Sequence, residues 1–196
     1  MDQFDTYLDR LASADPTPGG GSAACVVGAL GAALCAMVAR ITQGNEPLAA
    51  DADRLRERFG AARRLDEAAY GRVVAASGLP KDTDERKRAR TAALQAALAG
   101  AAEAPLEAAG LAAEGMGLAE RTAALQNRHL VSDVECALHF FRAALAASAA
   151  NVRINHRFLR DAGTVAAQEE RLASIAHVAG SSESRALALV NGDAIR

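Results

Sequence analysis

Three consecutive glycines stand where the chain could bind an anion or a polarised ring. They belong to the stretch DPTPGGGSAA, residues 15–24, which leads into a long apolar segment. A glycine-rich turn at a helix start presents backbone N–H groups without intrahelical acceptors and a partial positive charge. It suits a carboxylate, a phosphate or a polarised heterocycle, although no Gly-Lys-Ser/Thr of a P-loop follows. The alternative is a tight turn that lets helices pack closely. The candidate residues are Pro18, Gly19, Gly20, Gly21 and Ser22.

Asp66 is the carboxyl group best placed to act beside this turn. It lies in LDEAAY, residues 65–70, in the middle of an expected helix. A short turn, residues 44–47, joins that helix to the preceding one, so we expect antiparallel neighbours. Asp66 follows the turn by about 18 residues, or ~27 Å, and the same distance back along the preceding helix ends near Cys25. Most acids on helices are simply solvated, but this one should lie level with the glycines.

Four further polar residues are candidates for binding, but they are spread along the expected helices. Lys81 lies about 22 Å beyond Asp66 if the helix continues straight, and Asp133 and Asn151 are about 27 Å apart on one helix. Either the ligand is long, or subunits combine their ends, or some of these residues are structural. Asn155 follows Asn151 by one turn on a largely apolar face, which indicates hydrogen bonds between helices or a polar pocket.

The composition and the positions of turn and capping residues predict an all-α protein. Hydrophobic residues make up 51% of the 196 residues, aromatic residues only 4%, and there is no Trp. The apolar residues are mostly Ala, Leu and Val, and both Ala and Leu favour helices. We expect an up-and-down helical bundle of about six to seven helices with long central helices, in one domain over residues 1–196. The expected helices span 2–14, 22–43, 47–77, 84–102, 105–126, 132–161 and from 164 onward, with Pro105 opening the fifth.

Charge and residue spacing narrow the function classes. A net charge of −2 and a pI near 6.1 provide no overall basic field for nucleic acid. The uncharged run 23–39 is shorter than the ~20 residues of a membrane span and rich in Ala and Gly, so we expect a buried helix and no membrane association. The acidic N-terminus does not resemble a secretory signal, and we expect a cytoplasmic protein. Metal-site spacing is absent among Cys25, Cys35, Cys136, His129, His139, His156 and His177.

The motifs together resemble those of a known family. From about residue 4 to 161 the chain resembles the formimidoyltetrahydrofolate cyclodeaminase / methenyltetrahydrofolate cyclohydrolase family. The motifs that carry the resemblance are PTPGGGSAA with GALGAALCAMVA, DEAAY, LPKDTDERKRAR, AAEAPLEAA, QN with SDVECA, and NVRIN. The resemblance implies an all-helical homodimer or higher homo-oligomer that acts on a small-molecule folate. It also implies that no metal and no permanently bound cofactor is needed, with a tetrahydrofolate derivative as the substrate.

The same resemblance implies roles for individual residues. The family's catalytic acid lies in a D-x-x-A-Tyr/Phe element, ten residues from its aromatic residue to the proline of LPK. Tyr70 and Pro80 have this spacing, which places the acid at Asp66. The glycine turn would line the folate site, where a flat pterin or a glutamate tail could lie against bare backbone. Further candidates for folate binding are Lys81, Asn127, Asp133, Asn151 and Asn155.

Two reactions and one non-catalytic role follow from the resemblance. A cyclohydrolase adds water to 5,10-methenyl-tetrahydrofolate and opens the ring to the 10-formyl form, whereas a cyclodeaminase closes the ring of 5-formimino-tetrahydrofolate and releases ammonia. Both require proton transfer at nitrogen, which a carboxyl tuned by partial burial can perform. We expect a chain of this length to have no fused transferase domain, which favours the cyclohydrolase. A non-catalytic helical folate-binding or scaffold relative is the other alternative, because residues 44–47 replace the lysine-rich turn common in the family.

Overall fold

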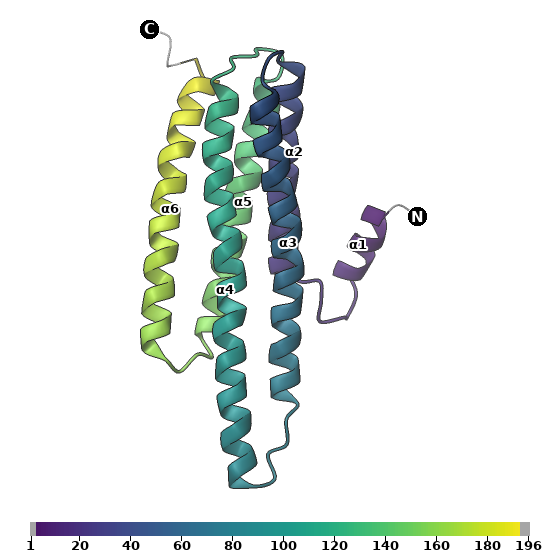
Figure 1. Cartoon of the computed structure of the whole chain (residues 1–196), viewed down its shortest axis with the longest axis vertical. Helices are drawn as coiled ribbons and strands as arrows, with labels where there is room; N and C mark the ends of the chain where they lie inside the picture. Colours follow the sequence, from purple (N-terminus) through teal and green to yellow (C-terminus); the bar gives the residue numbers. More distant parts are fainter. Residues whose placement is uncertain (1–2, 193–196) are drawn as a thin grey trace.

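The structure is a bundle of α-helices, in agreement with the predicted fold class. The computed structural model describes residues 3–192, and within this range it contains six helices and no strand. Figure 1 shows their up-and-down arrangement. In chain order the helices are α1 Gln3–Leu11, α2 Gly20–Ile41, α3 Glu46–Ser77, α4 Asp84–Ala123, α5 Val131–His156 and α6 Ala162–Val190. The first helix is shorter than expected, and α5 ends at His156 instead of near residue 161.

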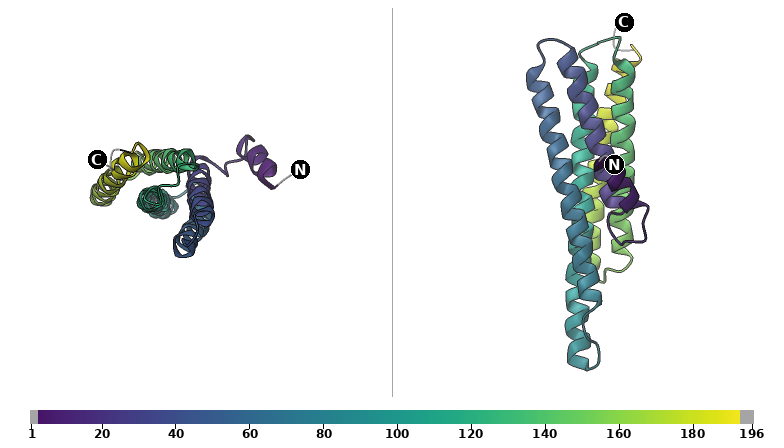
Figure 2. Two further views of the ribbon diagram at one scale, coloured as in Figure 1. Left: turned by 90° about the horizontal axis from the view of Figure 1, so that it is seen from above. Right: turned by 90° about the vertical axis from the view of Figure 1, so that its right-hand side faces the viewer.

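Helices α2 to α6 form the core, and α1 lies outside it. Helix α2 packs against α3 and α5, while α4 packs against α3, α5 and α6. The hairpin of α3 and α4 extends beyond the other helices, and α1 stands at the side of the bundle (Figures 1 and 2). Helix α1 contributes no residue to the buried core of residues 3–192. The bundle therefore has one protruding end, formed by two helices.

Small residues let the helices approach closely around two aromatic rings. Phe59 from α3 and Phe141 from α5 are fully buried, and their ring centroids lie 6.4 Å apart. A Cβ atom on Gly28 of α2 would lie 2.4 Å from the Phe59 ring, and one on Gly115 of α4 would lie 2.3 Å from the Phe141 ring. Real Cβ contacts are longer, so both positions need glycine. The two rings fill the space that small residues leave in the centre of the bundle.

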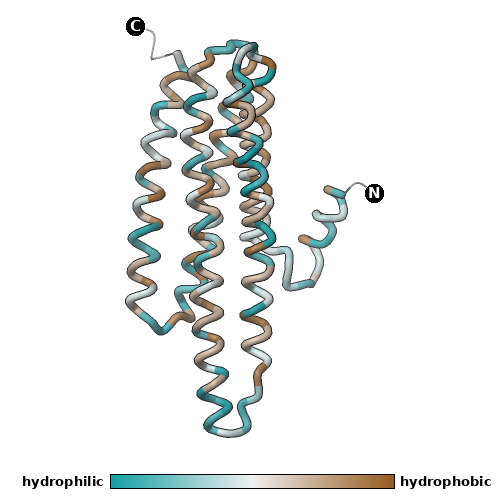
Figure 3. The backbone as a smooth tube through the Cα atoms, viewed as in Figure 1, coloured by the Kyte–Doolittle hydropathy of each residue, from teal (hydrophilic) through white to brown (hydrophobic). Residues whose placement is uncertain are grey.

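Helix α2 is long and apolar enough to span a membrane by length and composition alone. In this fold more than half of its most apolar stretch is buried, mainly against α3 and α5. Figure 3 shows the apolar segments of the chain concentrated along the long helices, with polar segments at the turns. This placement is the one expected for the central helix of a bundle.

The predicted helix boundary at Pro105 is wrong, because α4 continues through it as one 40-residue helix. Proline has no N–H to donate to the carbonyl four residues earlier, which here is Ala101 O. The side chain of Asn155 on α5 replaces that donor, with its Nδ2 at 3.1 Å from Ala101 O. The carbonyl that Pro105 leaves without an intrahelical partner is therefore bonded across the helix interface. This compensation allows a buried proline inside a long helix.

The compensation can be measured with a double-mutant cycle. Asn155→Ala should lower the free energy of unfolding by about 1–3 kcal/mol, because it leaves a buried carbonyl without a donor. In a Pro105→Ala background the new N–H of residue 105 can bond Ala101 O, so the same substitution should cost less. Urea unfolding of the four proteins provides the test. Equal losses in both backgrounds would contradict the compensation.

The glycine contacts of the core lead to a second stability experiment. Gly115→Ala should destabilise the protein by about 1–3 kcal/mol, because the new methyl group overlaps the buried Phe141 ring. Gly110→Ala on the same helix is the matched control, since among the described residues nothing outside its chain neighbours and the adjacent backbone of its own helix lies within 4 Å of its Cβ position. That control should raise stability by about 0.5–1 kcal/mol. Similar thermal unfolding midpoints for the two variants would contradict the packing analysis.

Candidate active site

A cleft of about 330 Å³ opens where α2 begins. Its walls come from the turn before α2, the middle of α3, the first half of α4 and the end of α5. Both polar groups and exposed apolar side chains line it. The lining residues are Pro16, Thr17, Gly19, Gly20, Gly21, Asp66, Tyr70, Val73, Leu98, Ala101, Asn151, Ile154, Asn155 and Phe158. Among these described residues Asp66 alone carries a formal charge at neutral pH.

The carboxyl group of Asp66 lies directly against the first turn of α2. A Cβ atom on Gly21 would lie 2.2 Å from Asp66 Oδ1, so glycine is required for this approach. The backbone N–H of Ser22 donates a hydrogen bond to the same carboxyl. Asp66 therefore lies level with the glycine turn, where the residue count had placed it. The first-turn N–H groups of α2 and this carboxyl form one polar corner of the cleft.

Burial raises the pKa of Asp66 above its ordinary value of 3.8. The nearby negative charge of Glu67 raises that pKa further, and the hydrogen bond from Ser22 N–H opposes both effects. Removing a carboxylate from water disfavours its charged form, and a second anion nearby does the same. The balance favours a carboxyl that can exchange a proton closer to neutral pH than an exposed aspartate can.

Two asparagines of α5 form the opposite polar wall. Asn151 Nδ2 donates to Ala147 O at 2.8 Å. Asn155 Nδ2 donates to Ala101 O at 3.1 Å and to Asn151 O at 2.8 Å. Both N–H groups of the Asn155 amide are therefore used, and its oxygen is the atom left to accept a hydrogen bond from a ligand. Of the two alternatives for this pair, helix-to-helix bonding is observed, and both residues also line a cleft.

The three glycines have different surroundings. Gly21 makes room for Asp66, and a Cβ on Gly20 would lie 3.3 Å from the Asn151 amide nitrogen. Apart from its two chain neighbours, no described residue has a heavy atom within 4 Å of a Cβ on Gly19. Two of the glycines thus bring polar side chains of α3 and α5 onto the backbone of α2. Gly19 is the one that borders open space, where a ligand could approach.

The other predicted binding residues lie outside this cleft. Pro18 is buried in the turn before α2, and Lys81 is exposed at the tip of the α3–α4 hairpin. Asn127 donates to Thr42 Oγ1 at 2.9 Å and lines a separate cavity of about 320 Å³. Asp133 is in the first turn of α5. Within one chain, the structure does not bring Lys81, Asn127 or Asp133 to Asp66.

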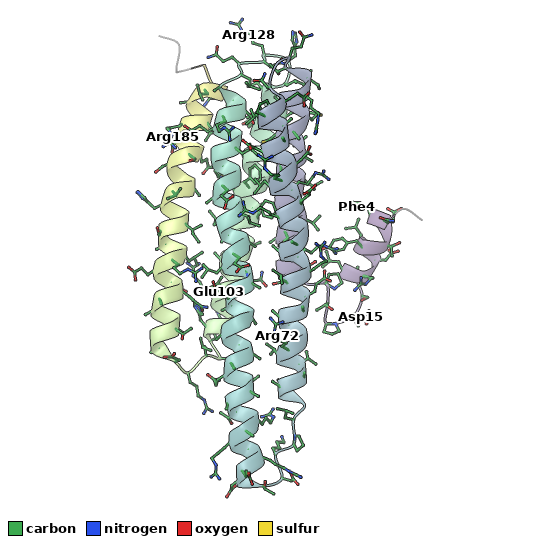
Figure 4. All side chains as sticks on the ribbon, in the orientation of Figure 1. Phe4, Asp15, Arg72, Glu103, Arg128 and Arg185 are labelled. Carbon is green, nitrogen blue, oxygen red and sulfur yellow. The ribbon has the colours of Figure 1, made fainter. Side chains whose placement is uncertain are left out.

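Figure 4 shows that the end of the bundle near Asn127 is separated from the part of α3 that follows Asp66. Arg128, the neighbour of Asn127, is at one end of the bundle, whereas Arg72, which follows Asp66 on α3, lies toward the hairpin end. The residue count could have excluded Asn127, because a residue in the turn before α5 must lie near the turn after α2 in an up-and-down bundle. A role for these distant residues stays a prediction.

Sequence reasoning missed two groups of residues around Asp66. Ile154 and Phe158 extend the apolar rim, and their spacing from Asn151 and Asn155 on α5 could have indicated them. Glu67 and Arg63 lie behind the cleft, where Arg63 Nη1 and Glu67 Oε1 are 3.3 Å apart. Their separation by four residues on a helix is the signal for that ion pair.

Comparison with known proteins identifies the family. Residues 3–174 match the family described as formiminotransferase-cyclodeaminase. The chain is 40% identical over 179 residues to a methenyltetrahydrofolate cyclohydrolase from Methylorubrum extorquens, which covers 86% of this chain and 85% of that protein. It is 32% identical over 180 residues to a formimidoyltransferase-cyclodeaminase from Sus scrofa, covering 87% of this chain but 33% of that longer protein.

A solved structure agrees with this assignment. The crystal structure of formiminotetrahydrofolate cyclodeaminase from Thermotoga maritima matches with a TM-score of 0.78 and 26% sequence identity, over 99% of this chain and 98% of that chain. The fold and the cleft define an all-α bundle with a partly buried acid against the start of a helix. The chain belongs to the formiminotransferase-cyclodeaminase family.

The raised pKa of Asp66 makes stability depend on pH in a defined direction. In the folded protein Asp66 binds its proton more tightly than in the unfolded chain, whose pKa is near 3.8. As pH rises from that value through the folded pKa, the unfolded state binds fewer protons, so the wild type loses stability. Asp66→Asn removes this loss, and its urea unfolding free energy should exceed that of the wild type at neutral pH. The advantage should disappear in acid, and two parallel stability curves would contradict it.

Proposed function

We propose that the protein is a folate one-carbon enzyme, a methenyltetrahydrofolate cyclohydrolase. The observation that carries the proposal is the Asp66 carboxyl, partly buried at the mouth of the cleft against Gly21. Support for the reaction comes from the Methylorubrum extorquens relative, which has this name and aligns over most of both chains. The substrate, 5,10-methenyl-tetrahydrofolate, carries a delocalised positive charge at the reacting carbon. A single carboxylate in an otherwise uncharged cleft complements that charge.

The proposed chemistry assigns two proton transfers to Asp66. Water adds to the methenyl carbon and gives one proton to the carboxylate, which produces a neutral carbinolamine. When this intermediate collapses to the formyl group, its hydroxyl proton is released, the bond from carbon to N5 breaks, and N5 takes the proton from Asp66. The product is 10-formyl-tetrahydrofolate, with one proton released overall. A pKa raised toward neutral suits a group that must accept and return a proton in one cycle.

The cleft offers complementary surfaces for the rest of the substrate. The apolar rim of Tyr70, Ile154 and Phe158 is exposed and could cover a flat ring system. The amide oxygen of Asn155 and the first-turn N–H groups at Gly20 and Gly21 could bond the polar edges of that ring. Gly19 borders open space at the same corner. These groups support binding of a pterin-like heterocycle beside the carboxyl.

The second candidate function is formimidoyltetrahydrofolate cyclodeaminase. It is favoured by the similarity of the whole fold to the Thermotoga maritima enzyme. In this reaction N10 attacks the formimino carbon, and the leaving nitrogen must be protonated before ammonia departs. Asp66 could supply that proton from the same position. The two reactions share an acid and a tetrahedral carbon, so the cleft geometry supports both.

The proposal extends to the assembly and location of the enzyme. We propose a homodimer or higher homo-oligomer, which could bring Lys81, Asn127 or Asp133 of one subunit near the cleft of another. We also propose a cytoplasmic enzyme of one domain that uses the folate as substrate without a resident metal or cofactor. The remaining alternative is that this chain is a helical folate-binding or scaffold protein without turnover.

Asp66→Asn is the decisive substitution for the proposed function. It should lower kcat by about 10²–10⁴-fold, because the amide cannot carry the proton, while folate binding is largely retained. Purified protein is assayed with 5,10-methenyl- and 5-formimino-tetrahydrofolate, and binding is followed by thermal shift. Glu57→Gln, on the exposed face of α3, is the control and should keep wild-type turnover.

The outcomes of this assay separate the alternatives. Turnover of the formimino substrate alone by the wild type would assign the cyclodeaminase. Wild-type turnover that survives in Asp66→Asn would remove the proton-transfer role. A wild type that neither turns over nor binds folates would leave the scaffold alternative.

A further inference from the structure

One buried serine joins the two adjacent acids of α3. Ser22, in the first turn of α2, is fully buried. Its backbone N–H donates to the Asp66 carboxyl, and its hydroxyl donates to Glu67 Oε1 at 2.9 Å. Asp66 faces the cleft, whereas Glu67 is not among the residues that line it. Glu67 therefore lies behind Asp66 as seen from the cleft, and Ser22 is hydrogen-bonded to both acids.

The hydrogen bonds around this serine have a defined direction. The hydroxyl of Tyr7 lies 3.0 Å from Ser22 Oγ. Ser22 has one hydroxyl proton, and the Glu67 carboxylate can only accept, so Tyr7 must donate to Ser22 and Ser22 to Glu67. Arg63 contacts the same Glu67 oxygen, and its guanidinium lies 5.6 Å from the centre of the Tyr7 ring. The four side chains of Tyr7, Ser22, Glu67 and Arg63 form a closed ring of contacts, which we term the Ser22 network.

We infer that Glu67 is a positioning residue for Asp66, held behind the cleft by the Ser22 network so that its fixed negative charge controls the protonation of the acid. This inference rests on the proposed role of Asp66. Two contacts, with Ser22 and with Arg63, restrain the Glu67 side chain. Because 23% of that side chain is exposed, its charge is only partly screened. A carboxylate that is fixed in place and kept out of the cleft can act on Asp66 without contacting substrate.

The other groups around Asp66 do not provide an equivalent negative charge. On α3 these are Arg63, which is paired with Glu67, and Tyr70 at the cleft opening. On α2 the nearby titratable group is Cys25, whose pKa burial raises to about 12, so it is neutral at physiological pH. Helix α1 contributes Tyr7, and the residues of α4 and α5 that line the cleft are uncharged. Removal of the Glu67 charge should therefore act on Asp66 directly.

The test is a direct titration of Asp66 in the intact protein. Carboxyl-¹³C-aspartate labelling gives one resonance that disappears in Asp66→Asn, and its chemical shift is followed against pH. Glu67→Gln should move the titration midpoint of Asp66 to lower pH, because a neutral amide replaces the neighbouring charge. Glu67→Asp keeps the charge and should restore a midpoint near that of the wild type. Glu57→Gln on the same helix is the matched control and should leave the midpoint unchanged.

A second variant tests the network itself. Ser22→Ala retains the backbone N–H that bonds Asp66 but removes the hydroxyl that holds Glu67. It should lower the Asp66 midpoint by less than Glu67→Gln does, since the charge remains but is no longer restrained. The pH profile of kcat/KM should move in the same direction as the midpoint in both variants.

Each result decides between defined possibilities. An Asp66 midpoint that is the same in Glu67→Gln and wild type would overturn the inference. A shifted midpoint with an unmoved pH–rate profile would also overturn it, because Glu67 would then act on a carboxyl that does not limit turnover. A shifted midpoint in a protein that turns over neither folate would leave the coupling intact and overturn the proposed function.

Discussion

The contact between Gly21 and Asp66 is the constraint on which the candidate site depends. It places a carboxyl of α3 on the first turn of α2, at a distance that any side chain at position 21 would prevent. The contact requires α2 and α3 to lie close together at this level. Gly28 provides this farther along α2, where it accepts the edge of Phe59. The packing of the core and the geometry of the acid are therefore two consequences of one close helix pair.

At this position the pKa of Asp66 is subject to effects of opposite sign. The start of a helix stabilises an anion through free N–H groups and the helix dipole, and Ser22 N–H provides such a bond. Burial and the Glu67 charge raise the pKa of Asp66, and together they outweigh the lowering effect of the Ser22 hydrogen bond. A fully solvated acid would remain ionised, and a fully buried one would remain protonated. The corner between α2 and α3 gives an intermediate environment, which proton transfer in both directions requires.

The parts of the structure that follow from local rules could be predicted from the sequence. The position of Asp66 beside the glycines follows from the fixed rise per residue of an α-helix and from the short turn between α2 and α3. The break expected at Pro105 did not occur, because the replacement donor for Ala101 comes from Asn155 on another helix. The link between Ser22 and Glu67 was missed for the same reason. Contacts between residues distant in sequence decide whether a polar group is satisfied, and no single helix pattern contains them.

The cleft itself results from helices of unequal length. Helix α3 has 32 residues and α2 has 22, and the two are paired from the turn that joins them. Helix α3 therefore continues for about ten residues, or ~15 Å, beyond the start of α2. Past Asp66 helix α3 no longer has α2 beside it, so Tyr70 is exposed at the cleft, while Val73 packs partly against α4. An extension of α2 by a few residues at its start would fill this space and bury Asp66 completely. The turn of prolines and glycines before Gly20 sets the start of α2 at the level where Asp66 is still partly accessible. This is a physical reason for the position of the turn in the sequence.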